Sequence, residues 1–190
     1  MKKIFSMILV ILLCFCMCAC SASEEDQPES KETQEAAEEK EEEKENSDAM
    51  PVFSATDLDG NTVTSDIFSQ ADITVVNFWA TYCRPCINEM PELAEWQESM
   101  PENVQIIGIV VDTDTAESDT ADLARQIVDQ TGVKYQNLVA SDDLDAVLGE
   151  IIGVPTTYFV DKEGHFVGNA IIGANVKDYK QRVEAYLQQL

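Results

Sequence analysis

Two cysteines two residues apart are the part of this sequence best suited to chemistry. Cys83 and Cys86 lie in the stretch WATYCRPCINEMPEL, with Arg84 and Pro85 between them. Glu89 follows three residues after the second cysteine. A pair at this spacing can be a structural disulfide, a metal site or a working dithiol. Because a bridge that closes so short a loop stabilises a fold only weakly, we favour redox chemistry.

Cys83 is expected at the junction between a buried strand and a helix. The apolar run ITVVNFWA before it is typical of a strand covered on both faces. Helical periodicity starts after Cys86, and Pro85 suits a first helical turn. Free N–H groups at a helix N-terminus, together with the Arg84 cation, would stabilise a thiolate. We therefore predict that Cys83 is the nucleophile and that Cys86 resolves the mixed disulfide.

The elements that must position this dithiol read as an α/β domain. A hairpin with an Asp-Gly turn is predicted within 51–68. Further strands are expected where β-branched and aromatic residues gather: 73–80, 104–111, 137–140, 156–160 and 165–171. Helices are expected where apolar residues recur at helical spacing: 87–100, 119–132, 142–149 and 176–190. Because parallel strands need crossovers over the faces of a sheet, this order predicts a three-layer α/β sandwich around a mixed sheet.

Acidic residues dominate the chain and are unevenly placed. There are 36 acidic and 12 basic residues, which give a formal net charge of −24. A protein of this charge repels nucleic acid and anionic membrane surfaces, so we expect no nucleic-acid partner. Residues 21–49 alone contain 13 acidic residues, three lysines and no aromatic residue. Such a segment cannot bury enough apolar surface to fold, and we predict a disordered tether over 20–49.

Residues 1–19 predict export from the cytoplasm. Lys2 and Lys3 precede an apolar run that is shorter than the about 20 residues of a spanning helix, as in a signal peptide. The run leads into MCAC, which resembles a bacterial lipobox, so Cys20 is expected to carry a lipid and become the new N-terminus. An uncleaved anchor helix is the alternative. Either way, the domain 50–190 is expected at the extracytoplasmic face of a bacterial cell membrane, with the dithiol as its only cysteines.

Four stretches together resemble the TlpA/ResA branch of the thioredoxin-like superfamily: FSATDLDGNTV (53–63), the dithiol motif, IIGIVVD (106–112) and GVPTTYFVD (153–161). The resemblance covers essentially all of 50–190. It implies a thioredoxin-like fold with an N-terminal β-hairpin extension. It also implies a membrane-anchored thiol-disulfide oxidoreductase that needs no cofactor. Such proteins mostly reduce selected partner proteins, for example in cytochrome c maturation, and a membrane electron donor recharges them.

The resemblance further implies roles for individual residues. Pro155 would be a cis-proline that faces the cysteines and leaves the backbone of Val154 free to pair with a substrate. Glu89 would take a proton from Cys86 or tune its reactivity. The residues expected to meet the substrate surround the dithiol: Trp79, Arg84, Pro85, Val154 and Pro155. For Trp79, an ordinary place in the core is the alternative.

Two residues depart from the pattern of related proteins. Asn77 stands in the strand before the motif, in VNFWA, where many thioredoxins have aspartate. Because an amide cannot accept a proton, acid–base help must come from Glu89 or from water. Tyr82 replaces the tryptophan that is usual in this branch, which changes the rim of the site.

Four other functions stay open at this point. A disulfide-donating oxidase would share both the fold and the dithiol. A copper-delivery protein would need a histidine ligand, and His165 is the single histidine of the chain. A peroxidatic enzyme would carry threonine three residues before its cysteine, whereas Thr81 stands two residues before Cys83. A lipoprotein with an inert bridge would act only as a binding module.

Overall fold

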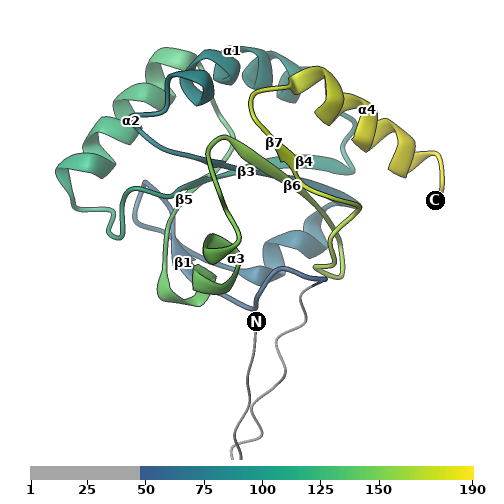
Figure 1. The fold of residues 1–190 in the computed structure, drawn as a ribbon, viewed down its shortest axis with the longest axis horizontal. Coiled ribbons are helices and arrows are strands. Elements are labelled where there is room, and N and C mark those ends of the chain that lie inside the picture. The colour runs from purple at the N-terminus through teal and green to yellow at the C-terminus, as the bar shows by residue number, and fades with distance from the viewer. Residues whose placement is uncertain (1–47) are drawn as a thin grey trace, which may run out of the picture. The chain divides into compact units, whose positions relative to one another are not determined.

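The computed structural model describes residues 48–190 of the chain (Figure 1). The predicted export signal over 1–19, the predicted lipid site Cys20 and the predicted tether up to residue 47 lie outside the described residues. Within the described part, no helix is both long enough and apolar enough to cross a membrane.

The last two residues of the predicted tether contact the domain. The Phe166 N–H donates to the Asp48 carbonyl over 2.8 Å, and Ala49 forms an isolated β-bridge with His165. Backbone pairing with the domain therefore extends back to Asp48.

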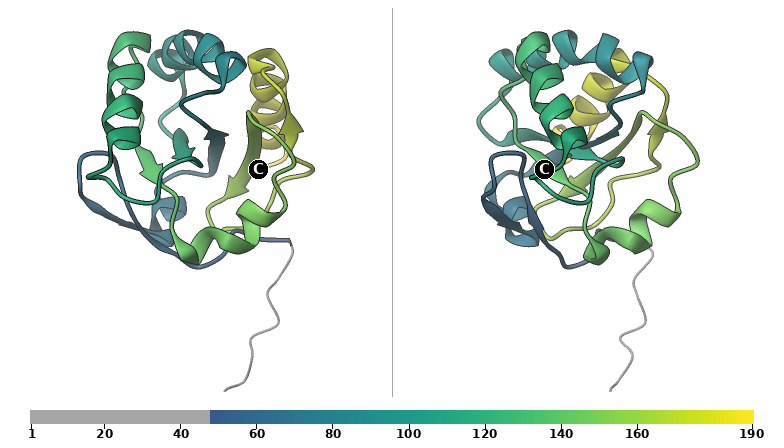
Figure 2. Two further views of the ribbon diagram at one scale, coloured as in Figure 1. Left: turned by 60° about the vertical axis from the view of Figure 1, so that its left-hand side comes forward. Right: turned by 90° about the vertical axis from the view of Figure 1, so that its left-hand side faces the viewer.

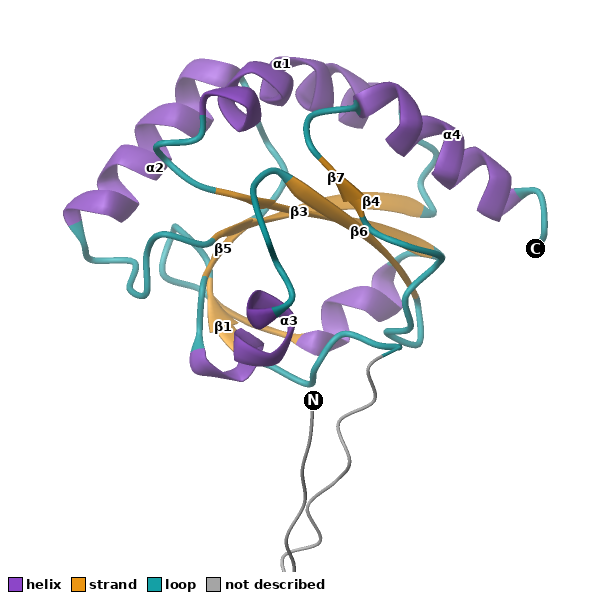
Figure 3. Cartoon of the chain, in the orientation of Figure 1, coloured by secondary structure: helices purple, strands orange, loops and turns teal. Residues whose placement is uncertain are grey.

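A mixed five-stranded sheet forms the middle layer, in the order β5–β4–β3–β6–β7 (Figure 1). Its strands are β3 (Ile73–Trp79), β4 (Val104–Val110), β5 (Asn137–Val139), β6 (Thr156–Asp161) and β7 (Ile171–Ile172). β3, β4 and β5 run parallel, whereas β6 and β7 are antiparallel to their neighbours. All seven residues of β3 are buried, because both faces of the sheet are covered (Figure 3). The predicted mixed sheet is confirmed.

Two further layers enclose the sheet. One face carries three helices: α1 (Arg84–Ser99), α2 (Asp119–Thr131) and α4 (Val176–Leu187) (Figure 1). The other carries the hairpin of β1 (Ser54–Thr56) and β2 (Thr62–Thr64), the 3-10 helices Ser65–Gln70 and Asp142–Leu144, and α3 (Asp145–Gly149) (Figure 2). A hydrophobic core lies on each face of the sheet. Successive side chains of β3 point into the two cores alternately, Val75 on the helical side and Val76 on the hairpin side. The predicted three-layer sandwich with an N-terminal hairpin is therefore confirmed.

The second predicted hairpin is interrupted in its second strand. In the predicted strand 165–171, residues 165–167 pair with the end of β6 and Ile171–Ile172 pair with its start as β7, whereas 168–170 interrupt the pairing. Arg182 of α4 explains the difference, because its Nη1 donates to the carbonyls of Val167 and Asn169, both over 3.1 Å. Gly168 between them has a φ of 68°, which favours glycine. A tertiary contact therefore occupies the carbonyls at the point where the predicted strand is interrupted.

Other element ends differ by a few residues. The first hairpin ends at Thr64, and the chain continues as a 3-10 helix that buries Ile67 and Phe68. α1 starts at Arg84, before the predicted position 87, because Cys83 caps it. α4 ends at Leu187, three residues before the predicted end.

Candidate active site around the Cys83–Cys86 disulfide

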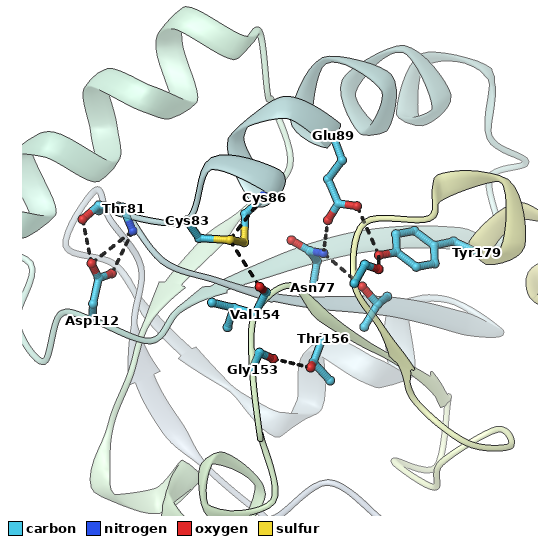
Figure 4. The surroundings of a disulfide bond; sticks show 12 residues. Asn77, Thr81, Cys83, Cys86, Glu89, Asp112, Gly153, Val154, Thr156 and Tyr179 are labelled. Carbon is cyan, nitrogen blue, oxygen red and sulfur yellow. Dashed lines mark hydrogen bonds between the residues drawn. A yellow bond between two sulfur atoms is a disulfide. The ribbon is translucent and has the colours of Figure 1, made fainter.

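A disulfide joins Cys83 and Cys86 beyond the carboxyl end of β3, where α1 begins (Figure 4). Cys83 is the N-cap residue of α1, and the Cys86 N–H donates to its Sγ over 3.2 Å. Pro85 lies in the first helical turn, where its missing N–H costs no hydrogen bond. Cys83 is 5% exposed and Cys86 only 1%, so an incoming sulfur reaches Cys83 more readily. The predicted strand-to-helix junction is confirmed.

A carboxylate anchors the loop that carries Cys83. Asp112, just beyond the carboxyl end of β4, accepts the Thr81 N–H through both oxygens, each at 3.1 Å. It also accepts the Thr81 hydroxyl over 2.6 Å (Figure 4). The Cys83 N–H in turn donates to the Ala80 carbonyl over 3.0 Å. These bonds hold the turn between β3 and α1, and with it the position of the Cys83 sulfur.

The segment before β6 faces the nucleophilic sulfur. The Val154–Pro155 bond is cis, as the resemblance implies. The Val154 carbonyl oxygen lies 3.4 Å from Cys83 Sγ (Figure 4). The sulfur carries no proton in the disulfide, whereas a reduced thiol at this place could donate to that carbonyl. The Thr156 hydroxyl donates to the Gly153 carbonyl over 2.6 Å and fixes the turn around the proline.

Glu89 lies in the core beneath α1, one turn beyond Cys86. Its carboxylate accepts hydrogen bonds from Asn77 Nδ2 at 3.0 Å and from the Tyr179 hydroxyl at 3.1 Å (Figure 4). Burial raises the pKa of Glu89 to about 7, although both hydrogen bonds oppose the rise. Cys86 and Glu89 are three residues apart on α1, so they project from the same side of the helix. A carboxyl with this pKa can take and give a proton near neutral pH.

Asn77 and Tyr179 hold this carboxyl from the sheet and from α4. Asn77 Nδ2 also donates to Thr157 Oγ1 over 3.0 Å, while its Oδ1 has no partner among the described residues. The amide therefore positions Glu89 without exchanging a proton with it. Sequence reasoning missed Tyr179, which stands 90 residues after Glu89. The apolar periodicity of the predicted helix 176–190 marks Tyr179 only as one of several residues that face the core.

Trp79 belongs to the core and not to the substrate-binding rim. Its side chain is 0% exposed, and its Nε1 donates to Asn137 Oδ1 over 2.9 Å. Asn137 fits there because Gly108 has no side chain: a Cβ on Gly108 would lie 2.0 Å from Asn137 Oδ1. Trp79 therefore occupies an ordinary place in the core, the alternative given above, since a residue of a strand covered on both faces points into a core.

Exposed apolar side chains come from the three segments that meet at the disulfide. Tyr82 is 74% exposed next to Cys83, Ile152 is 86% exposed two residues before Val154, and Ile172 of β7 is 60% exposed. Ile172 pairs with the first residue of β6, just after the proline. We call Tyr82, Ile152 and Ile172 the apolar rim. Sequence reasoning noted Tyr82 but missed both isoleucines, although an apolar residue in a loop beside Val-Pro is a usable signal.

Arg84 and Pro85 are exposed beside this rim, as predicted for residues that meet a substrate. Their contact with a substrate stays a prediction. The Arg84 side chain points to solvent, so its charge acts on the sulfur through a partly aqueous medium.

His165 lies at the other end of the sheet from the disulfide. β6 runs antiparallel to β3, with Ile73 opposite Asp161 and Phe78 opposite Thr156. His165 is exposed just beyond Asp161, and its Nδ1 is 3.5 Å from the Asp161 carboxylate. The cysteines follow the opposite end of β3. The histidine that copper delivery would require is therefore remote from them, and among residues 48–190 no metal-binding group of three His, Cys, Asp or Glu side chains gathers.

Comparison with known proteins agrees with this geometry. The sequence pattern of the AhpC/TSA family matches residues 47–167, which include the disulfide, Glu89 and cis-Pro155. The chain belongs to the AhpC/TSA family. Thiol-disulfide oxidoreductase ResA of Bacillus anthracis, a curated relative, is 33% identical over 143 residues, which cover 74% of this chain and 75% of that protein. Thiol:disulfide interchange protein DsbE of Pseudomonas aeruginosa is 30% identical over 126 residues, 61% of this chain and 60% of its own.

Solved structures related to this AhpC/TSA family member have the same fold. A thiol:disulfide interchange protein of Chlorobium tepidum superimposes with a TM-score of 0.61 at 25% identity, covering 72% of this chain and 94% of that one. StoA from Bacillus subtilis superimposes with a TM-score of 0.57 at 16% identity, covering 72% and 98%, and supports the fold alone. The thioredoxin-like fold is confirmed. The relatives and the Cys83–Cys86 pair together support thiol-disulfide oxidoreductase activity.

Proposed function

We propose that this protein is an extracytoplasmic, membrane-held reductant of disulfides in selected partner proteins. The observation that carries the proposal is the Cys83–Cys86 pair at the N-terminus of α1, in a chain whose relatives are named thiol-disulfide oxidoreductases. The predicted signal over 1–19 and lipid on Cys20 would hold it at the membrane, and the acidic segment over 20–49 would give it reach.

The first step is attack on a partner disulfide by the reduced protein. The N–H of Cys86 and the N-terminus of α1 stabilise a thiolate at Cys83. This thiolate attacks one sulfur of the partner disulfide, whose S–S bond breaks, and the departing thiolate takes a proton from water. A mixed disulfide between Cys83 and the partner results.

The second step releases the partner. Glu89 takes the proton of the Cys86 thiol, directly or through one water, and the new thiolate attacks Cys83 Sγ. The mixed disulfide breaks, the second partner thiolate leaves, and the Cys83–Cys86 disulfide forms. Two electrons have passed from this protein to the partner. A membrane electron donor would return them by reducing the disulfide.

The partner would bind as an extended segment across the site. The backbone of Val154 and Pro155 faces Cys83 Sγ, so a partner cysteine placed there lies next to the nucleophile. The apolar rim, with Arg84 and Pro85, would contact the residues around that cysteine. Cysteine pairs of apocytochrome c, within cytochrome c maturation, are one partner class of this chemistry. The acidic surface would favour basic partners, which a salt series on the exchange rate would test.

The midpoint potential of Cys83–Cys86 tests the direction of exchange. The protein is equilibrated against glutathione or thioredoxin buffers and the fraction of disulfide is measured. A value near or below about −230 mV lies in the range of reducing thioredoxin-like proteins and would support the proposal. A value near about −120 mV would instead identify a disulfide donor, the second candidate. Absence of any exchange would reject both.

A further inference from the structure

The hydroxyl of Tyr179 lies between two acceptors that compete for its single proton. It is 3.1 Å from Glu89 Oε2 and 2.9 Å from the Gly173 carbonyl oxygen. A phenol donates one hydrogen bond, so it can serve only one of them at a time. Burial raises the pKa of Tyr179 to about 12, so the hydroxyl keeps its proton at neutral pH. The Asn175 N–H, at 3.3 Å, and the Thr157 hydroxyl can both donate to its oxygen, and the Asn175 N–H is also within hydrogen-bonding reach of Glu89.

The charge of Glu89 decides which acceptor receives the proton. An ionised Glu89 can only accept, so it draws the Tyr179 hydroxyl to itself and leaves the Gly173 carbonyl without this donor. A protonated Glu89 can donate to the Tyr179 oxygen. The hydroxyl is then free to donate to the Gly173 carbonyl.

Gly173 is also bonded to the segment that faces Cys83. Its N–H donates to the Pro155 carbonyl over 2.7 Å. It directly follows β7, whose two residues pair with the first two residues of β6. A continuous series of contacts therefore runs from Glu89 through Tyr179 and Gly173 to Pro155.

We propose that Tyr179 is a positioning residue that transmits the protonation state of Glu89 to the Pro155 segment. This inference rests on the proposed function, in which Glu89 receives the Cys86 proton during the second step. As the disulfide forms, the Tyr179 hydroxyl turns from Glu89 to the Gly173 carbonyl. The Gly173 carbonyl therefore lacks the Tyr179 hydrogen bond before the partner leaves and accepts it afterwards. The Pro155 carbonyl, which accepts the Gly173 N–H, experiences this change through Gly173.

The other titratable groups around Glu89 do not replace Tyr179 in this role. The negative charge of Glu92, on the same helix, disfavours ionisation of Glu89. Glu92 is exposed, so solvent weakens this repulsion. Tyr135, which lies just before β5, is buried with its hydroxyl unpartnered among the described residues, and burial raises its pKa, so it stays neutral. Cys86 is bonded in the disulfide and does not titrate there.

Nuclear magnetic resonance of the oxidised full chain tests the inference at each contact. The signals to follow with pH are the side-chain carboxyl carbon of Glu89, the carbonyl carbon of Gly173 and the amide proton of Gly173. In the wild-type protein we expect all three to titrate with one midpoint. In Tyr179→Phe the midpoint of Glu89 should move upward, because the carboxylate loses a donor, and both Gly173 signals should stop following it.

Two more variants make the test specific. Tyr135→Phe removes another buried phenol hydroxyl from the same core and should leave all three signals as in the wild type. Glu89→Gln has an amide that can always donate to Tyr179, so both Gly173 signals should stay at their low-pH positions at every pH. That variant keeps the test valid if Tyr179→Phe does not fold.

Three patterns of the Gly173 signals would overturn the inference. They are Gly173 signals that do not titrate in the wild type, that still follow Glu89 in Tyr179→Phe, or that titrate in Glu89→Gln. A Gly173 carbonyl carbon that titrates while the Gly173 amide proton does not would also overturn the inference, because the effect of Glu89 would then not reach the hydrogen bond to Pro155. None of these readouts needs exchange with a partner, so a failure of the proposed reductase function remains separately visible in the potential measurement.

Discussion

Glu89 is a buried carboxyl group whose surroundings raise its pKa to about 7. Desolvation under α1 is the larger influence and raises its pKa, while hydrogen bonds from Asn77 and Tyr179 favour the charged form and limit the rise. The charge of Glu92 acts in the same direction as burial. A group in this balance changes its charge near neutral pH, where exposed carboxyls stay ionised.

The shifted pKa of Glu89 predicts a pH-dependent stability. The pKa rises from 4.5 to about 7 on folding, so the native state binds more protons between these values. The contribution of Glu89 to the free energy of unfolding is full below about pH 4.5. It is lost as the pH rises through about 7, by up to about 3 kcal/mol. Urea unfolding of the oxidised protein over this range should show the loss.

The matching variants for this prediction lie on one helix. Glu89→Gln should remove the pH dependence, because an amide does not titrate. Glu95→Gln, on the exposed side of α1, should leave it as in the wild type. An unchanged pH dependence in Glu89→Gln would contradict the assignment of this titration to Glu89.

The unequal exposure of the two cysteines predicts different outcomes for their serine variants. Cys83→Ser should abolish exchange, because the accessible nucleophile is lost. Cys86→Ser should still attack and then accumulate a mixed disulfide, since no resolving thiol remains. Incubation with disulfide-bonded insulin, followed by non-reducing electrophoresis and mass spectrometry, would detect the adduct. An adduct on Cys86 in the Cys83→Ser variant would reverse the assigned roles.

At the scale of elements, the site depends on how closely β4 and β5 approach each other. Asn137 at the start of β5 reaches over Gly108 of β4 to accept the indole N–H of Trp79. The Asn137 Nδ2 also donates to the Tyr135 carbonyl over 3.0 Å, which fixes the side chain at both ends. Trp79 is the last residue of β3, so this contact steadies the strand end from which the Cys83 loop departs.

A methyl group on Gly108 is therefore expected to be costly. In Gly108→Ala the new Cβ would lie 2.0 Å from Asn137 Oδ1 and 3.1 Å from Trp79 Nε1, and the buried hydrogen bond would have to move. We expect a loss of about 1–3 kcal/mol in the free energy of unfolding, as for other overpacked cores. Gly149→Ala in α3, where nothing lies within 4 Å of the added Cβ, should be neutral or slightly stabilising. Equal effects of the two substitutions in urea unfolding would contradict this account.

In the molecule as a whole, the topology gathers the apolar rim at the end of the sheet where β3 finishes and β6 starts. β6 starts at this end because it runs antiparallel to β3. Tyr82, Ile152 and Ile172 come from segments far apart in the sequence that this arrangement brings to the disulfide. The rest of the described surface is rich in acidic side chains, so the rim offers a local apolar contact area.

The rim should matter for protein substrates and not for small disulfides. Ile152→Ser and Ile172→Ser each remove an apolar side chain that a bound protein would cover. If covering each side chain is worth about 1.4 kcal/mol, kcat/KM for insulin reduction should fall roughly tenfold, while reduction of oxidised glutathione stays unchanged. Val52→Ser is the control, because Val52 is at least as exposed as both isoleucines but lies in the N-terminal segment. Equal losses with both substrates would place the effect on the dithiol itself.

The local chemistry of the chain was predictable because it acts over a few residues. An apolar run predicts β3, a proline suits the first turn of α1, and the spacing of Cys83 and Cys86 predicts their joint reactivity. The motif around Pro155 adds the cis bond through the family resemblance. Glu89 was predicted as the proton-handling group, and its burial and raised pKa agree with that role, which stays a proposal until exchange is measured.

The kind of chemistry and the order of elements thus follow from local patterns in the chain, whereas packing between distant elements selects the residues that contact the site. Trp79 became a core residue because both faces of β3 are covered. The predicted strand before β7 is interrupted where Arg182 binds the carbonyls of Val167 and Asn169. Tyr179 reached Glu89 because α1 and α4 lie on the same face. Periodicity and caps report only on neighbours along the chain, and these three outcomes depend on packing between elements that the chain brings together from far apart.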